Sequence, residues 1–173
     1  MKLLKSWEWE RHPRSWSDTA AILAATGFGL GLSRVASGTF GTLPGVLILL
    51  AVPGLWHGPI LWQALFALAL CLFAVFLCDR AEKHFGTKDD GRIVADEYLT
   101  FPLCMIGLPL HTWVLAMAFV SHRVMDILKP YPARTLQRVP GGAGIVIDDV
   151  FSSLYSLALN HVLYDAILQR ATG

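Results

Sequence analysis

The sequence predicts an all-α fold, namely a polytopic membrane helical bundle in which some helices are broken or re-entrant. Three observations lead to this prediction. The 173-residue chain is 54% hydrophobic and 16% charged, whereas a soluble domain has roughly 45–50% and 25%. Its Asp, Glu, Lys and Arg residues are absent from three long stretches. Proline and glycine interrupt several apolar segments, which is typical of membrane helices that do not run straight through a bilayer.

The three stretches without charged residues cover 35–78, 98–122 and 150–164, and they are 44, 25 and 15 residues long. A charged side chain is costly in hydrocarbon and nearly free in a loop, so this distribution indicates membrane segments. The alternative is the buried all-α core of a soluble protein, but the lengths of these stretches weigh against it.

The first stretch contains the clearest transmembrane candidate. Ile60–Cys78 has 19 residues, and at a rise of about 1.5 Å per residue it extends about 28 Å, close to the thickness of a hydrocarbon core. Leu43–Trp56 is shorter and is interrupted by Pro53 and Gly54. We therefore expect a helix there that pairs with Ile60–Cys78 across a turn over 53–59.

The other two stretches predict one broken and one continuous helix. Tyr98–Val120 contains Pro102, Gly107 and Pro109, which indicates either a kinked span or a helical hairpin. Gly144–Tyr164 predicts a final apolar helix that carries two acidic residues in its first turns.

The basic residues predict the orientation of the bundle. Beyond the N-terminus, Lys and Arg lie mostly in two loops, 80–92 and 123–138, and by the positive-inside rule both loops face the cytoplasm. Two loops on one side require the segment between them to enter and return, which favours the hairpin.

The N-terminal segment differs from the rest of the chain. Trp7, Trp9 and Trp16 alternate with charged residues there, and no apolar stretch of a signal peptide is present. We expect residues 1–18 to form an interfacial arm, because tryptophan favours the headgroup level of a membrane. Residues 19–173 are then a single membrane-embedded domain.

Charge and cysteine content exclude two classes of function. The 14 basic and 13 acidic residues nearly balance, so the chain lacks the positive charge that a nucleic-acid partner requires. The three cysteines lie inside apolar segments without a C-x-x-C spacing, which argues against a redox centre or a thiolate metal site.

The acidic residues indicate a candidate site, because seven of the 13 lie at the edges of apolar segments. They form three groups, which are Asp89, Asp90, Asp96 and Glu97, then Asp126, then Asp148 and Asp149. If the helices converge, these carboxylates make the hard-oxygen environment that Mg²⁺ or Mn²⁺ prefers. The alternative is solvated loop acids that cap helix N-termini, which fits Asp89 and Asp90 well.

Basic residues accompany these acids. Arg123, Asp126 and Lys129 are spaced three apart on a helix that Pro130 helps to end, so their side chains are neighbours. One interpretation is an intrahelical salt bridge, and the other gives Asp126 to a metal and leaves both cations to bind phosphate. The glycines of 141–144 indicate either an anion-binding helix N-terminus or a tight turn, and those of 38–41 indicate either an anion-binding loop or close helix packing.

Four motifs in order carry a family resemblance. They are Gly38-Thr39-x-Gly41, Val94-x-Asp96-Glu97, Arg123-x-x-Asp126-x-x-Lys129-Pro130 and Gly141-Gly142-x-Gly144-Ile145-x-x-Asp148-Asp149. Together they resemble the phosphatidylglycerophosphatase A family over about residues 27–159. The resemblance implies a phosphatase domain of the bacterial inner membrane. It also implies Mg²⁺-dependent hydrolysis of phosphatidylglycerophosphate to phosphatidylglycerol and inorganic phosphate. Since the acidic motifs lie beside the two basic loops of this multi-pass bundle, we expect the active site to face the cytoplasm.

The chemistry of phosphate monoester hydrolysis then assigns a role to each residue type. We expect one or two Mg²⁺ ions to be held by five acids, which are Asp96, Glu97, Asp126, Asp148 and Asp149. Among these, Asp96, Glu97, Asp126 and Asp149 are the expected catalytic residues. Thr39, Arg123 and Lys129 are the expected substrate-binding residues.

Two alternatives to this function follow from the sequence. One is a phosphatase of another phosphorylated lipid, since pocket geometry decides which head group is accepted. The other is an ion or proton transporter lined by carboxylates, which would also keep acids beside broken helices. Transporters of that kind usually contain inverted repeats, and the sequence has none.

Overall fold

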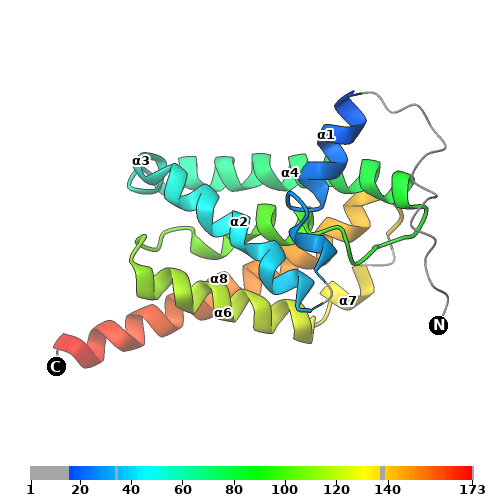
Figure 1. Cartoon of the computed structure of the whole chain (residues 1–173). Helices are drawn as coiled ribbons and strands as arrows, with labels where there is room; N and C mark the ends of the chain where they lie inside the picture. Colours follow the sequence, from blue (N-terminus) through cyan, green and yellow to red (C-terminus); the bar gives the residue numbers. More distant parts are fainter. Residues whose placement is uncertain (1–15, 34, 137–138, 173) are drawn as a thin grey trace.

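The computed structural model describes residues 16–33, 35–136 and 139–172, and every regular element in this part of the chain is helical (Figure 1). The all-α prediction is therefore confirmed. Most of the expected interfacial arm, residues 1–15, lies outside the described residues. The elements are α1 (Trp16–Ala25), η2 (Leu30–Leu32), α2 (Ser37–Ala51), α3 (Pro53–Trp56), α4 (Ile60–Phe85), α5 (Ala95–Thr100), η3 (Phe101–Met105), α6 (Thr112–Leu128), α7 (Ala133–Leu136) and α8 (Gly142–Thr172).

Four long helices form a bundle around a short broken one. Helices α2, α4, α6 and α8 lie along the molecule, and α5 with η3 packs between them, against α2, α4 and α8 (Figure 1). Helices α2 and α8 begin, and α4 and α6 end, at the end of the bundle that carries α1 and α7. We call this the α7 end and the opposite one the α3 end.

The segment expected to form a hairpin does so. Helix α5 and η3 lead the chain from the α7 end toward the α3 end, and α6 brings it back. The tip is held there by hydrogen bonds: Gly107 N donates to Gln63 Oε1 (2.8 Å), and His161 Nε2 lies 2.9 Å from the Ile106 carbonyl oxygen. The positive φ of Gly107 (77°) makes the turn possible. The helix is broken where Pro102 stands in η3.

Helix α2 begins earlier than the sequence predicts, at Ser37, and its glycines explain why. A Cβ atom on Gly41 would lie 2.6 Å from Val94 Cβ, and one on Gly45 would lie 2.5 Å from the Tyr98 carbonyl oxygen. These glycines therefore form a face that lets α2 approach the α5 segment closely. Close helix packing was one of the two interpretations of the glycines at 38–41. The first turn of α2 reaches the start of α5.

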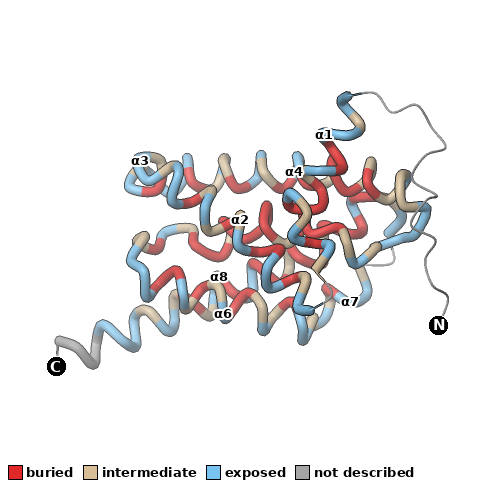
Figure 2. The backbone as a smooth tube through the Cα atoms, viewed as in Figure 1, coloured by how far each residue is buried: buried red, intermediate tan, exposed pale blue. Residues whose placement is uncertain are grey.

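Two apolar clusters form most of the interior, but polar side chains are also buried there and large apolar side chains are exposed; Figure 2 shows which parts of the backbone are buried. Buried polar side chains are concentrated on α5, α6 and α8, and include Thr100, Ser121, His122, Ser152, Ser153, Ser156 and Asn160. Exposed apolar side chains run along α4, namely Leu61, Trp62, Leu65, Leu68, Leu72, Phe73 and Phe76. In the part of the chain that the structure describes, two helices are long and apolar enough to cross a membrane, Ile60–Phe85 and Gly142–Leu168. A contiguous apolar surface of this kind usually contacts a membrane or another protein.

Candidate active site

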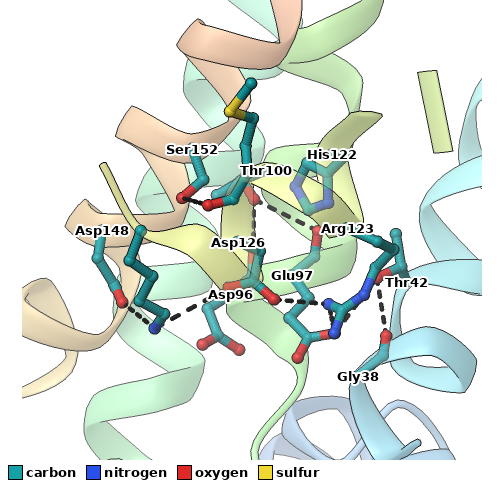
Figure 3. Close-up of polar contacts among 12 residues, drawn as sticks. Gly38, Thr42, Asp96, Glu97, Thr100, His122, Arg123, Asp126, Asp148 and Ser152 are labelled. Atoms are coloured by element: carbon teal, nitrogen blue, oxygen red, sulfur yellow. Dashed lines mark hydrogen bonds and ion pairs between the residues drawn. The ribbon is translucent and has the colours of Figure 1, made fainter. Parts of the chain in front are cut away.

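Five of the acids at the edges of the apolar segments converge, and Figure 3 shows four of them, Asp96, Glu97, Asp126 and Asp148, close together. Asp96 and Glu97 stand in the first turn of α5, Asp126 in the last turn of α6, and Asp148 and Asp149 in the second turn of α8. Asp96, Asp126, Asp148 and Asp149 are each at most 8% exposed. Three helices thus bring together the residues that the sequence placed in separate motifs.

Arg123 joins α6 to α5. Its Nη1 atom donates to Glu97 Oε2 (2.9 Å) and to Asp126 Oδ2 (2.8 Å). The guanidinium also lies against α2, because a Cβ atom on Gly38 would collide with Arg123 Nη2 and would stand 2.5 Å from Glu97 Oε1. The intrahelical Arg123–Asp126 bridge considered from the sequence is present, and it extends to a second helix.

Lys129 joins α6 to α8. Its Nζ atom lies 2.5 Å from Asp148 Oδ2 and 3.9 Å from Asp126 Oδ1. Lys129 adopts a left-handed conformation (φ 44°) as the C-cap of α6, which turns its side chain toward the acids of α8. Burial lowers the pKa of Lys129, but the hydrogen bond to Asp148 and the negative charges nearby together outweigh burial and raise this pKa above its usual value. Lys129 is therefore a charged cation here.

The two cations do not neutralise the five acids. Burial, followed by the negative charges of Glu97 and neighbouring aspartates, raises the pKa of Asp96 well above its usual range. Burial also raises the pKa of Glu97 to about 7, against the opposing effect of Arg123. Asp149 interacts electrostatically with Asp96, Asp126 and Asp148. A cluster with this excess of buried carboxylates favours an additional cation.

Two buried carboxylate oxygens, Asp96 Oδ1 and Asp148 Oδ1, have no hydrogen-bond partner. Unpaired buried oxygens are costly, and together with the surrounding acids they are the donor set that suits a hard divalent cation. Nevertheless, no three His, Cys, Asp or Glu side chains among the described residues stand in a metal-binding arrangement. Arg123 and Lys129 lie between the carboxylates instead.

Thr39, one of the three expected substrate-binding residues, is exposed on the first turn of α2, outside the ion-pair network. Sequence reasoning missed Thr42, one turn further on. The Thr42 hydroxyl donates to the Gly38 carbonyl (2.8 Å) and lies 3.2 Å from Glu97 Oε2. The available signal was that Thr42 stands four residues after Gly38, since i and i+4 share a helix face.

The glycines before α8 serve helix packing. A Cβ atom on Gly142 would lie 2.5 Å from the Asp79 backbone nitrogen, so Gly142 allows α8 to start against α4. Gly141 has a positive φ (76°) and its carbonyl accepts from Gly144 N (2.9 Å), so the tight turn considered for residues 141–144 is present, and close packing on α4 adds to it.

The two loop acids behave differently from each other. Asp90 bonds to Arg92, with Nε 2.7 Å from Asp90 Oδ1, as expected for a loop acid. Asp89 is exposed and has a left-handed backbone (φ 51°), yet its charge acts on Asp96 and Asp148. Asp89 thus lies near the cluster, as expected if the acidic groups converge, whereas Asp90 follows the loop-acid alternative.

His122 is a second residue that sequence reasoning left out. It is fully buried on α6 next to Arg123, and its Nε2 atom lies 3.1 Å from Ser153 Oγ on α8. Its ring meets Phe101 edge-on, with centroids 5.6 Å apart. His122 therefore helps to set the spacing of α5, α6 and α8 just inside the acidic cluster.

Comparison with known proteins supports the same interpretation of the motifs. The family model described as phosphatidylglycerophosphatase A matches residues 23–164. The chain belongs to the phosphatidylglycerophosphatase A family. The matched region contains every acid and base of the site described above, and family membership makes the chain a phosphatase.

Three curated relatives cover most of the chain. It is 36% identical over 142 residues to "Phosphatidylglycerophosphatase A" of Escherichia coli strain K12, covering 79% of each chain. The protein of the same name from Haemophilus influenzae is 37% identical, over 78% of this chain and 83% of the relative. A "Putative phosphatidylinositol-3-phosphatase" of Bacteroides thetaiotaomicron is 32% identical, over 80% and 89%. No solved structure matches the chain.

Proposed function

We propose that this protein hydrolyses the phosphate monoester of phosphatidylglycerophosphate to phosphatidylglycerol and inorganic phosphate, with Mg²⁺ as cofactor. The observation that carries the proposal is the cluster of five acids, four of them buried, with two cations, in a chain whose two named phosphatidylglycerophosphatase relatives are 36% and 37% identical. An acidic site needs positive charge before it can accept a phosphate, and Arg123 and Lys129 alone leave it negative.

The acids are the proposed metal ligands: Asp96, Glu97, Asp126, Asp148 and Asp149. When bound there, Mg²⁺ would neutralise phosphoryl oxygens and lower the pKa of water. Either Glu97 or Asp149 is the proposed base that accepts the proton of the attacking water. A bond then forms between that water oxygen and phosphorus, the bond from phosphorus to the glycerol oxygen breaks, and this oxygen leaves as a hydroxyl after taking up a proton.

Arg123 and Lys129 are the proposed phosphate ligands. Both donate charge-assisted hydrogen bonds to carboxylates in the structure, and the same donors suit phosphate oxygens. Thr39, exposed beside the cluster on α2, is the proposed additional donor at the rim. Thr42 and Gly38 support Glu97 and Arg123 rather than the substrate.

The proposed location is the bacterial inner membrane, which the protein crosses several times with its site at the cytoplasmic face. Along α4, Trp62 and Arg80 are 18 residues apart, or about 27 Å, close to the thickness of a hydrocarbon core. Lys88 Nζ donates to the Val139 carbonyl (3.0 Å), so the two basic loops meet at the α7 end. Trp113 and Tyr164 stack near the other end, as in an interfacial aromatic belt.

A second candidate substrate is another phosphorylated lipid, because one relative carries the name of a phosphoinositide phosphatase. The experiment that separates the candidates measures phosphate release by the purified protein in detergent micelles. Phosphatidylglycerophosphate, phosphatidylinositol 3-phosphate and phosphatidic acid are compared at equal concentration with Mg²⁺. We expect the first to be hydrolysed with the highest kcat/KM. A higher kcat/KM for either other lipid would refute the substrate assignment.

A further inference from the structure

We propose that Lys129 is an exchangeable counter-ion: it holds the carboxylates of Asp126 and Asp148 in the metal-free protein and moves to the substrate phosphate when a divalent cation binds. This inference rests on the proposed function, because it assumes that the acids bind a metal. It adds an order of events to that function, in which the metal creates the phosphate site by releasing a lysine.

The position of the Lys129 ammonium group indicates that it competes with a metal. Lys129 Nζ lies 2.5 Å from Asp148 Oδ2 and 3.9 Å from Asp126 Oδ1, so it occupies the place where acids of two helices meet. The Asp148 side chain is 2% exposed, and its other oxygen has no partner. A metal ligated by both acids would lie between them, where the ammonium group now is, and the unpaired Asp148 oxygen would be free to bind it, so the ammonium group and the metal compete for this position.

The Lys129 side chain has room to move away from the acids. Lys129 is 25% exposed and stands at the end of α6, next to Pro130, so its flexible stem can turn outward without crossing the core. Arg123 cannot do this as easily. It is 16% exposed, bonds to two carboxylates, and lies against Gly38. Of the two cations, only Lys129 both pairs with a carboxylate that the metal would bind and can turn its side chain toward solvent.

Electrostatics supplies the direction of the exchange. A divalent cation beside Asp126 and Asp148 repels an ammonium group a few ångströms away, and a phosphate at the rim attracts it. Metal and phosphate should therefore strengthen each other's binding through Lys129. Such coupling is reciprocal by thermodynamic linkage.

The test measures Mn²⁺ affinity of the full-length protein in detergent by the EPR signal of free Mn²⁺, with and without inorganic phosphate. Lys129→Met removes the competing charge, and Asp126→Asn removes a ligand. Lys83→Met is the matched control, because Lys83 is 74% exposed and pairs with Asp79 outside the cluster. Lys129→Gln, which keeps a hydrogen-bond donor for Asp148, replaces Lys129→Met if that variant does not fold.

We expect Lys129→Met to bind Mn²⁺ about tenfold more tightly than wild type, Lys83→Met to match wild type, and Asp126→Asn to bind weakly. Phosphate should tighten Mn²⁺ binding in wild type by a larger factor than in Lys129→Met. If wild type binds Mn²⁺ and Asp126→Asn does not, the metal site is supported. In that case the exchange is still wrong if Lys129→Met binds Mn²⁺ no more tightly than wild type, or if phosphate tightens Mn²⁺ binding in Lys129→Met as much as in wild type. If wild type binds no Mn²⁺, the proposed metal site itself fails, and the exchange with it.

Discussion

At the scale of single residues, Arg123 connects three helices of the site. It bonds to Glu97 on α5 and to Asp126 on α6, and it fills the space beside Gly38 on α2. Arg123→Gln is expected to lower kcat for phosphate release by about 100-fold or more, because it removes a donor to the phosphate and leaves buried carboxylates unpaired.

The control for this prediction is another arginine in an ion pair. Arg80 bonds to Asp18 at 2.5 Å, but the two side chains are 40% and 47% exposed. Exposed pairs of this kind contribute at most about 1 kcal/mol, so Arg80→Gln should keep nearly full activity. An Arg123→Gln variant as active as Arg80→Gln would show that Arg123 has no role in the reaction.

Residue roles could be predicted from the sequence only in part. The acids and bases were found because ionisable groups at the edge of apolar segments are rare and costly. Thr42 and His122 were not found, because their importance depends on which helix lies opposite them. Thr39 was favoured over Thr42 because it belongs to the motif, whereas the helix turns it to the surface.

At the scale of helices, the approach of α2 to α5 sets the position of Glu97. A Cβ atom on Gly41 would lie 2.6 Å from Val94 Cβ and 3.2 Å from Glu97 Oε2. Gly41→Ala should therefore push the helices apart, destabilise the protein by about 1–3 kcal/mol, and lower activity. Thermal unfolding in detergent and phosphate release measure the two effects.

Gly54→Ala is the matched control for Gly41→Ala. Nothing lies within 4 Å of the Cβ position at Gly54, on α3 at the other end of the bundle. Its activity and Tm should equal or slightly exceed those of wild type. If Gly41→Ala behaves like Gly54→Ala, close packing of α2 on α5 does not position the site.

The helices themselves were largely predictable, because their apolar segments are long and their breaks contain proline or glycine. The hairpin of α5, η3 and α6 follows from Pro102, Gly107 and the basic loops on either side. The start of α2 was missed because Gly38 and Gly41 weaken a helix signal, and only contact with α5 explains why they are helical.

At the scale of the whole molecule, the bundle has two chemically different ends. The α7 end carries the acidic cluster and the basic loops, and the α3 end carries the hairpin tip. In a membrane, Lys83→Cys and Arg134→Cys should be labelled from the same side, the cytoplasmic one, and His57→Cys from the opposite side. All three positions are exposed, and the native cysteines are buried.

Inner-membrane vesicles of known orientation and a membrane-impermeant maleimide provide the measurement. The protein with only its native cysteines gives the background. Labelling of Lys83→Cys and Arg134→Cys from opposite sides would contradict the arrangement of the bundle, since the segments that follow α4 and α7 are joined by the hydrogen bond from Lys88 to Val139. Labelling of both from the periplasmic side would instead reverse the proposed orientation.

The central claim is that the buried carboxylates form a metal-dependent phosphatase site. The most direct measurement is phosphate release from phosphatidylglycerophosphate with Mg²⁺ or EDTA, for wild type, Asp126→Asn and Asp90→Asn. Asp90 is the matched acid, because it pairs with Arg92 outside the cluster. We predict that wild type and Asp90→Asn release phosphate only with Mg²⁺ and that Asp126→Asn loses at least about 100-fold in kcat. Undiminished release in EDTA, or full activity of Asp126→Asn, would contradict the claim.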